Sequence, residues 1–355
     1  MWGDFQLGGH SIAPGHHALV DLPVASLLSH APVKLTARVW RGKRPGPCLM
    51  VTACLHGDEV CGAEVVRRVM MSPALKRLRG TLIAVPVMNM TSFMAGTRYL
   101  PDRRDLNRLF PGAAAGSLGA RLAKVMTGEL LPLVDAVIDM HSGAVNRGNL
   151  PQVRVTSNDR ASMELAKAFN PPAILVSSTR EGSFREACRV AGKPVVLYES
   201  GEALRLDAAT IRFGMQGVFS VMRHLEMLPP RKKGEVRKTP TVVCRRSAWD
   251  RAPLGGLFTP LVGLGKAVNE GDMLGFVGDP FGPREVPVTA SLSGFVIGRS
   301  NEGLVGEGDA LFHIAMTSDP TEAEEGIVES GEALPAIPDE GDDHPVHGDV
   351  FSENP

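Results

Sequence analysis

A histidine and a glutamate, His56 and Glu59, stand three residues apart where the apolar run 49–55 gives way to a polar turn. On the first turn of a helix, residues three apart lie on one face, so this imidazole and this carboxylate could reach one ion. The pair suits a hydrolytic zinc site, in which three protein ligands leave one position open for water. The spacing alone is also typical of a solvated pair, so the rest of the chain must supply further evidence.

A third zinc ligand is expected far along the chain, and His141 fits that role at the end of the apolar run 136–140. Asp139 precedes it by two residues, so in a strand both side chains point to the same side. A carboxylate in that place can accept the free N–H of a metal-bound imidazole. The alternative for Asp139 is a cap at the end of the strand. We therefore expect one zinc ion per chain, held by His56, Glu59 and His141.

Apolar runs alternate with helical patterns along the first 230 residues. We expect strands at residues 17–24, 33–40, 49–55, 81–87, 136–140, 152–156 and 195–198, and helices at 63–71, 118–131, 161–169, 183–191 and 208–228. This alternation predicts an α/β domain whose largely parallel sheet is covered by helices on both faces. Ligands of such folds bind beyond the carboxyl ends of the strands. Four polar residues follow expected strands in this way: His56, Asn89, His141 and Glu199.

The pattern of amino-acid types changes after a Pro- and Lys-rich linker at residues 229–234. Residues 241–314 consist of short, Gly-rich apolar runs in two similar halves, which resemble the barrel-sandwich of biotinyl and lipoyl carrier domains. Carriers present a lysine between the halves, whereas residues 278–285 contain none, so we expect a structural or lid role. The expected boundaries are a catalytic domain at 1–230, a small all-β domain at 235–317 and a disordered acidic tail at 318–355.

Composition limits the function classes. The 355 residues exceed the usual size of one core and favour two domains. The start of the chain lacks the pattern of a secretion signal and no run of about 18 apolar residues occurs, so the cytoplasm is the expected location. Five cysteines without a C-x-x-C pair argue against a thiolate zinc site. Basic residues outnumber acidic ones before the tail, which suits an anionic substrate but, without an aromatic-rich basic run, predicts no nucleic-acid binding.

Four blocks together resemble the succinylglutamate desuccinylase/aspartoacylase family, relatives of the zinc carboxypeptidases. The blocks are His56-Gly57-Asp58-Glu59, residues 96–99 with 105–112, Asp139-Met140-His141 and Glu199-Ser200-Gly201. The resemblance runs from about Val20 to Arg223, and the trailing β-rich region is also similar to that of the family. It implies a carboxypeptidase-like mixed sheet with helices on both faces, followed by a small barrel-sandwich-like β-domain.

The resemblance also implies a function: zinc-dependent hydrolysis of the amide bond of a small N-acyl amino acid or related N-acyl amine. Glu199 matches the general base of the family, and Arg98 matches the residue that stabilises the oxyanion. Asn107 and Arg108 match the pair that binds the α-carboxylate of the substrate. Asp105 is expected to orient this loop, whose alternative is a basic surface cluster.

Two other functions stay open from the sequence. A zinc carboxypeptidase acting on short peptides would use the same metal site, and a non-catalytic binder of small carboxylates would keep the pocket without turnover. The acyl group also stays open, because Tyr99 and Tyr198 are the only tyrosines of the chain. Three arginines could give a second contact to an anion: Arg147, Arg180 and Arg205. The expected partner is a small molecule, neither nucleic acid nor a membrane, and a homo-oligomer is left open.

Overall fold

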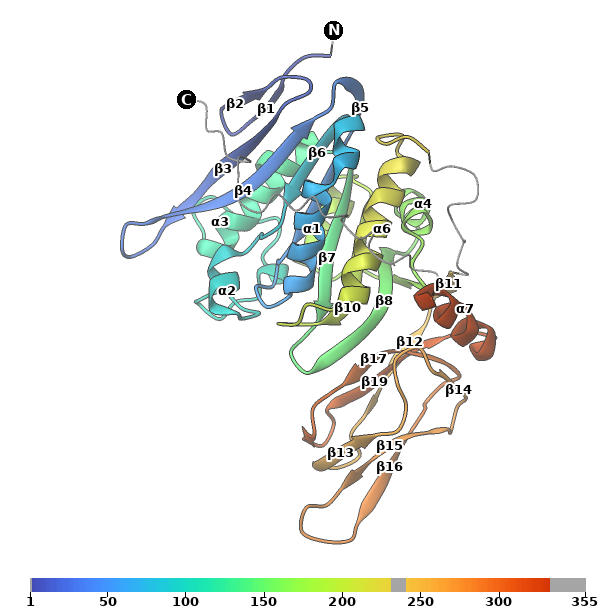
Figure 1. The fold of residues 1–355 in the computed structure, drawn as a ribbon. Helices are drawn as coiled ribbons and strands as arrows, with labels where there is room; N and C mark the ends of the chain where they lie inside the picture. Colours follow the sequence, from blue (N-terminus) through green and yellow to red (C-terminus); the bar gives the residue numbers. More distant parts are fainter. Residues whose placement is uncertain (1, 231–240, 333–355) are drawn as a thin grey trace, which may run out of the picture.

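The structure, a computed structural model, describes residues 2–230 and 241–332 (Figure 1). A 13-stranded mixed sheet runs through the molecule in the order β12-β19-β17-β8-β10-β7-β5-β6-β4-β3, with β9, β11 and β14 paired at its sides. Its strands are β3 (His17–Ser26), β4 (Pro32–Arg41), β5 (Arg44–Ala53), β6 (Arg79–Val85), β7 (Ala136–Gly143), β8 (Arg147–Thr156), β9 (Ala173–Ser177), β10 (Val195–Glu202), β11 (Val242–Cys244), β12 (Ser247–Arg251), β14 (Ala267–Val268), β17 (Gly294–Ser300) and β19 (Ala310–Met316).

The centre of the sheet is parallel, because β5 runs parallel to β6 and β7, and β7 runs parallel to β10. Both flanks are antiparallel, since β4 pairs antiparallel with β3 and β6, and β8 pairs antiparallel with β10 and β17. The expectation of a largely parallel sheet is therefore wrong, and the sheet is mixed. The reason is that β3–β4 and β7–β8 are joined by short turns, which permit only antiparallel arrangement of the joined strands.

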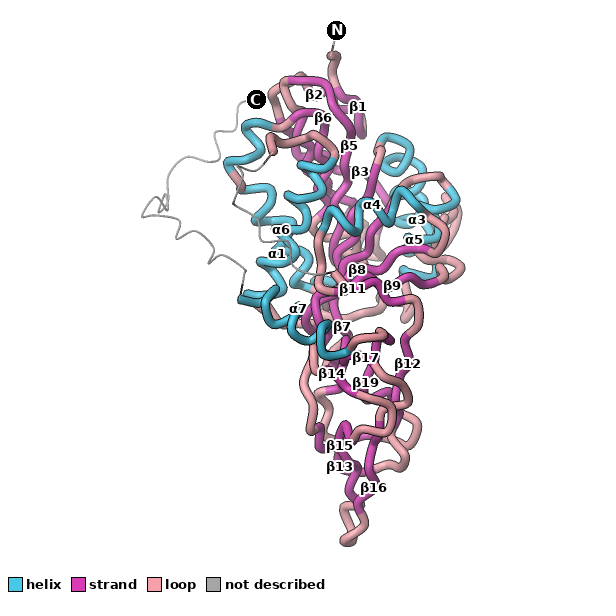
Figure 2. The backbone as a smooth tube through the Cα atoms, turned by 90° about the vertical axis from the view of Figure 1, so that its right-hand side faces the viewer, coloured by secondary structure: helices cyan, strands magenta, loops and turns pink. Residues whose placement is uncertain are grey.

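Helices cover both faces of the sheet, as expected. They are α1 (Val60–Met71), α2 (Met90–Ala95), α3 (Leu118–Val125), α4 (Arg160–Phe169), α5 (Phe184–Val190), α6 (Ala208–His224) and α7 (Pro320–Glu332). Figure 2 shows α1 and α6 on one side of the strands and α3 and α5 on the other. Two apolar cores result, and successive residues of β5 alternate between them, with Met50 in one and Val51 in the other. Within the described residues, no helix has the length and apolar character needed to cross a membrane.

The C-terminal region is rich in strands, but it continues the large sheet. Strand β17 pairs with β8, and β19 and β12 extend the sheet beyond it. A separate four-stranded sheet packs below, formed by β13 (Gly256–Pro260), β15 (Met273–Gly278), β16 (Glu285–Thr289) and β18 (Leu304–Val305). Strand β11 instead pairs with β9, beside β8. The strand at 242–244 thus joins the α/β part, and the proposed domain boundaries stay a prediction.

Helix α7 contradicts part of the expected disordered tail. Residues 320–332 form a helix on the C-terminal strands, whereas residues 333–355 of the expected tail lie outside the described residues. Ala323 is buried, and the Glu324 carboxylate accepts hydrogen bonds from Lys266 Nζ and Ala267 N, each at 2.8 Å. Ala323 and Ile327 are four residues apart and therefore form a short apolar face on the helix. The acidic composition of the segment hid this face from sequence analysis.

Several further elements were not expected from the sequence, among them strand β9. The N-terminal residues form a two-stranded sheet of β1 (Phe5–Leu7) and β2 (His10–Ile12). Helix α2 follows β6, which ends at Val85, and the Asn89 side chain caps the helix by accepting a hydrogen bond from Ser92 N. Asn89 therefore has a structural task and is not part of the ligand cluster described below.

The docking of α7 predicts that two substitutions on this helix differ in effect. Ala323→Glu places a charge at a buried position and should lower the free energy of unfolding by about 1–3 kcal/mol. Val328→Glu, at a side chain that is 54% exposed, should change it by about 0.5 kcal/mol or less. Urea unfolding followed by circular dichroism measures both values. Equal effects of the two substitutions would mean that α7 is not held on the strands in solution.

Candidate metal centre and active site

The turn between β5 and α1 brings His56 and Glu59 together. Helix α1 begins only at Val60, so the two residues do not lie on its first turn, and the expected helical placement of the pair is wrong. Cys54 adopts a positive φ of 48°, and Glu59 N donates to His56 O at 3.2 Å, which folds the segment back on itself. The Glu59 carboxylate consequently lies beside the amino end of α1, where the helix dipole favours negative charge.

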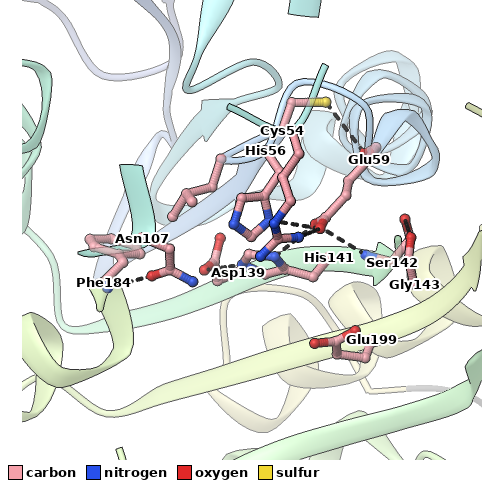
Figure 3. Close-up of polar contacts among 12 residues, drawn as sticks. Cys54, His56, Glu59, Asn107, Asp139, His141, Ser142, Gly143, Phe184 and Glu199 are labelled. Atoms are coloured by element: carbon pink, nitrogen blue, oxygen red, sulfur yellow. Dashed lines mark hydrogen bonds and ion pairs between the residues drawn. The ribbon is translucent and has the colours of Figure 1, made fainter. Parts of the chain in front are cut away.

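Three side chains converge on one point at the edge of the sheet (Figure 3). Glu59 Oε1 lies 2.6 Å from His56 Nδ1, and Glu59 Oε2 lies 2.7 Å from His141 Nδ1. His141 reaches the site from β7, whose Met140 pairs with Ala53 at the end of β5. All three side chains are buried, and their ligand atoms lie within 4.8 Å of one another. The three ligands expected from the sequence therefore come together.

The remaining ring nitrogen of each histidine faces a carboxylate. His141 Nε2 lies 2.8 Å from Asp139 Oδ2, and His56 Nε2 lies 3.2 Å from Asp105 Oδ1. The Thr52 hydroxyl in turn donates to Asp139 Oδ1 at 2.7 Å. These contacts fix both rings so that each Nδ1 faces the centre of the cluster, as metal-binding histidines require. Asp105 was expected to orient its loop, and it does so through a 2.8 Å hydrogen bond from Asn107 N as well as holding His56.

The charge of the cluster matches a divalent cation. Three carboxylates, Glu59, Asp105 and Asp139, contact the two imidazoles, and Arg98 is the one guanidinium paired with them in the described residues. With neutral imidazoles, two negative charges remain uncompensated. Two imidazoles and a carboxylate with one side left open form the donor set of a hydrolytic zinc site. The described residues therefore provide a donor set that fits a divalent cation such as Zn²⁺.

The charges within the cluster also shift the pKa values of the ligand side chains. Burial opposes charge on His141, but the Asp139 and Glu59 carboxylates outweigh it and raise the pKa of His141 well above its usual value. Burial likewise opposes charge on Glu59, yet the imidazoles of His56 and His141 hold the pKa of Glu59 well below its usual range. Without a metal, protons on the imidazoles balance the carboxylates, so metal binding must release protons.

The residues of the loop between α2 and α3 lie at different depths. Arg98 Nη1 lies 3.2 Å from Glu59 Oε1, and Arg98 Nη2 lies 3.5 Å from Asp105 Oδ2, which places this guanidinium against the cluster. Asn107 Oδ1 accepts a hydrogen bond from Phe184 N at 2.9 Å, which joins the loop to α5. Arg108 is exposed, and its Nη1 donates to Asn107 O at 2.5 Å. The structure thus brings Arg98 to the metal ligands and leaves Arg108 in solvent.

Glu199 lies on the strand next to His141. The two residues are register partners in the parallel pairing of β10 with β7, so their side chains share a face. The Glu199 side chain is 15% exposed, and its Oε2 accepts a hydrogen bond from Asn149 Nδ2 at 2.9 Å. Arg154 Nη1 lies 3.7 Å from the other oxygen. Glu199 therefore stands beside the ligand cluster without being one of its members (Figure 3).

Sequence reasoning missed a buried arginine near this carboxylate, Arg185 on α5. Its Nη2 donates to Ser177 Oγ and Ser178 O, whereas its Nη1 has no hydrogen-bond partner among the described residues. Burial, together with the nearby charge of Arg154, lowers the pKa of Arg185 to about 10. The only hint in the sequence was that Arg185 directly follows the apolar Phe184 in a segment with a helical pattern.

The arginines named from the sequence for a second anion contact are placed differently. The Arg147 guanidinium lies 4.9 Å from the centre of the Trp249 ring, and Arg205 Nε lies 3.5 Å from Glu202 Oε1. Arg180 is exposed. Arg154 and Arg185, which sequence reasoning did not name, are the arginines whose charges act near Glu199.

Comparison with known proteins decides the family. Residues 45–225, about half of the chain and all of the site described above, match the model of the succinylglutamate desuccinylase/aspartoacylase catalytic domain. The chain belongs to this family. The resemblance inferred from the four sequence blocks is thereby confirmed.

Individual relatives agree with this assignment. The N-alpha-acetyl-L-2,4-diaminobutyric acid deacetylase of Halomonas elongata is 27% identical over 317 residues, which cover 84% of this chain and 91% of that protein. The product-bound structure of the ectoine utilization protein EutE (DoeB) from Ruegeria pomeroyi is 28% identical, with a TM-score of 0.76 over 85% of this chain and 95% of that one. A succinylglutamate desuccinylase structure from Silicibacter is 27% identical, with a TM-score of 0.75 over the same shares. These matches confirm the mixed α/β fold.

The cluster predicts about one tightly bound zinc ion per chain. His141→Ala should abolish zinc binding, whereas Asp139→Ala should weaken affinity or activity roughly 10- to 100-fold, because Asp139 acts through the imidazole. Elemental analysis and zinc titration of the purified variants measure this. His224→Ala, at the exposed end of α6, is the control and should keep the full zinc content. A wild-type protein that takes up no zinc on titration would refute the assignment.

Proposed function

We propose that this protein is a zinc-dependent hydrolase that cleaves the amide bond of a small N-acyl amino acid or related N-acyl amine. The observation that carries the proposal is the buried cluster of His56, Glu59 and His141 with Glu199 on the adjoining strand. Relatives over most of the chain are named as a deacetylase of an acetylated amino acid and a succinylglutamate desuccinylase, and both names describe removal of an acyl group from nitrogen.

Each residue of the site has a proposed task. Zn²⁺ would be held by His56, Glu59 and His141, where it would act as a Lewis acid on the amide carbonyl and lower the pKa of water. Glu199 would accept the proton of the attacking water and return it to the leaving amine. Its position beside His141, with a carboxylate that water can reach, supports this task.

Arg98 is proposed to stabilise the negative charge that develops on the carbonyl oxygen. A cation held in a fixed place next to such charge stabilises it, and the Arg98 side chain is about two-thirds buried, at 30% exposure. The two contacts of Arg98 with Glu59 and Asp105 hold the guanidinium beside the metal ligands, where the reacting carbonyl must lie.

Recognition of the α-carboxylate is proposed for Asn107 and Arg108. The Arg108 side chain is exposed on the loop that also carries Arg98 and Asp105, and a guanidinium pairs well with a carboxylate through two parallel hydrogen bonds. Arg154 and Arg185 add positive charge on the Glu199 side, which supports an anionic substrate.

The proposal is tested by a hydrolysis screen over N-acetyl, N-succinyl and N-formyl amino acids and over dipeptides. Zinc-loaded enzyme should release the free amine from at least one N-acyl amino acid, and chelated enzyme should not. Glu199→Gln should keep the zinc and the fold but lower kcat by at least roughly 10²- to 10⁴-fold. Hydrolysis of dipeptides alone would favour a carboxypeptidase, binding without turnover would favour a non-catalytic carboxylate binder, and loss of zinc in Glu199→Gln would make Glu199 a ligand.

The two proposed arginine tasks predict different kinetic defects. Arg108→Ala should mainly raise KM for N-acyl amino acids and should matter much less for the corresponding amides, which lack the charge. Arg98→Ala should lower kcat for both substrates by roughly 10²- to 10³-fold, as expected for a lost oxyanion contact. Arg103→Ala, exposed on the same loop, is the control and should change neither constant. An Arg108→Ala defect of equal size for acid and amide would mean that the carboxylate is bound elsewhere.

A further inference from the structure

Asn149 lies between the proposed general base and the C-terminal strands. In β8 its backbone pairs with Gly201 of β10 on one side and with Gly298 of β17 on the other. The side chain is largely buried, and its Nδ2 donates to Glu199 Oε2 at 2.9 Å. Asn149 thus joins Glu199 to a strand that is far away in sequence and belongs to the C-terminal region.

The place of the Asn149 amide depends on the absence of a side chain at residue 298. A Cβ atom at Gly298 would lie 3.0 Å from Asn149 Oδ1, 3.2 Å from His313 Cβ and 3.5 Å from Trp249 Cη2. The His313 and Trp249 rings stack at 4.5 Å and close the far side. A side chain at residue 298 would therefore press on the amide oxygen, which would have to shift by a few tenths of an ångström.

Within the described residues, the hydrogen bond from Asn149 is shorter than the other contact of the Glu199 carboxylate, which is made by Arg154. Arg154 Nη1 lies 3.7 Å from Oε1, beyond ordinary hydrogen-bond distance, and its side chain is partly exposed. A carboxylate on a flexible side chain can rotate away from the position that proton transfer requires, and misplacement by about 1 Å can cost about 10² in rate. The Asn149 hydrogen bond is therefore the directional contact that selects the orientation of this carboxylate, and the longer Arg154 ion pair adds charge without fixing it.

We infer that Asn149 is a positioning residue for Glu199, and that Gly298 of β17 keeps the Asn149 amide in the orientation that this requires. This inference rests on the proposed function in one respect, namely that Glu199 is the general base. It assigns a task to the C-terminal strands: they form the wall that holds the base through Asn149. No residue of these strands has to touch the substrate for this task.

The kinetic test compares substitutions that differ in what they remove. Asn149→Ala should lower kcat roughly 10- to 100-fold, the size expected for a lost hydrogen bond to a charged group, with KM and zinc content nearly unchanged. Asn149→Leu keeps a side chain of similar size without the donor and without adding a charge next to Glu199, so it should be as defective, whereas a purely packing role would largely spare it. Gly298→Ala should lower kcat by a smaller factor, and the control Gly263→Ala, whose added Cβ meets nothing within 4 Å, should not.

A double-mutant cycle separates positioning from general damage. In a Glu199→Gln background, Asn149→Ala should cause little further loss of kcat, because the group that Asn149 positions is already disabled. A full additional loss in that background, or an Asn149→Leu enzyme with wild-type kcat, would overturn the inference.

A structural measurement keeps the inference testable even if no substrate is found, in which case the proposed function fails separately. Crystal structures of zinc-loaded wild type and Asn149→Ala should show the Glu199 carboxylate in different orientations relative to His141. An unchanged orientation would overturn the positioning role of Asn149, whatever the activity of the protein. Thermal unfolding of both proteins checks that the variant is folded.

Discussion

The Glu59 carboxylate is buried between two imidazoles, and keeping that charge away from water constrains the rest of the structure. Its side chain is 2% exposed, and a buried charge is costly unless it is paired and hydrogen-bonded. His56, His141 and Arg98 supply charged or polar partners, and Ser142 N donates to the second oxygen at 3.3 Å. The partners come from a turn, a loop and a strand, so the cost of the charge is offset only in the assembled fold.

The parallel centre of the sheet meets this requirement. His56 follows β5, Asp139 and His141 lie in β7, and Glu199 lies in β10, which are three neighbouring parallel strands. Their register places Thr52 beside Asp139 and Glu199 beside His141. Apolar cores pack against these strands on both faces. The loop around Arg98 and Asp105 then closes the cluster from outside the sheet.

Sequence reasoning succeeded where a local pattern determines a position in space. Apolar runs that end in a polar residue give the strands and the edge at which their ends meet, so the cluster of His56, Glu59 and His141 could be predicted from the amino-acid sequence alone. The local geometry was less predictable, because the helix start at Val60 depends on the positive φ of Cys54. Helix α7 was hidden by its acidic composition, since its stability comes from packing on β14 and β17 and from Glu324.

The surroundings of Glu199 could not be predicted, because they depend on strand pairing between distant segments. Asn149, Arg154 and Gly298 become neighbours only when β8 pairs antiparallel with both β10 and β17. Strand register has no local signal in β17, whose residues are buried along nearly the whole strand and so lack an alternating pattern. The positions of the metal ligands and of the proposed base are therefore determined by different features of the chain. The ligand cluster follows from strand ends that are encoded locally, whereas the orientation of Glu199 depends on the C-terminal strands being in register with the catalytic sheet.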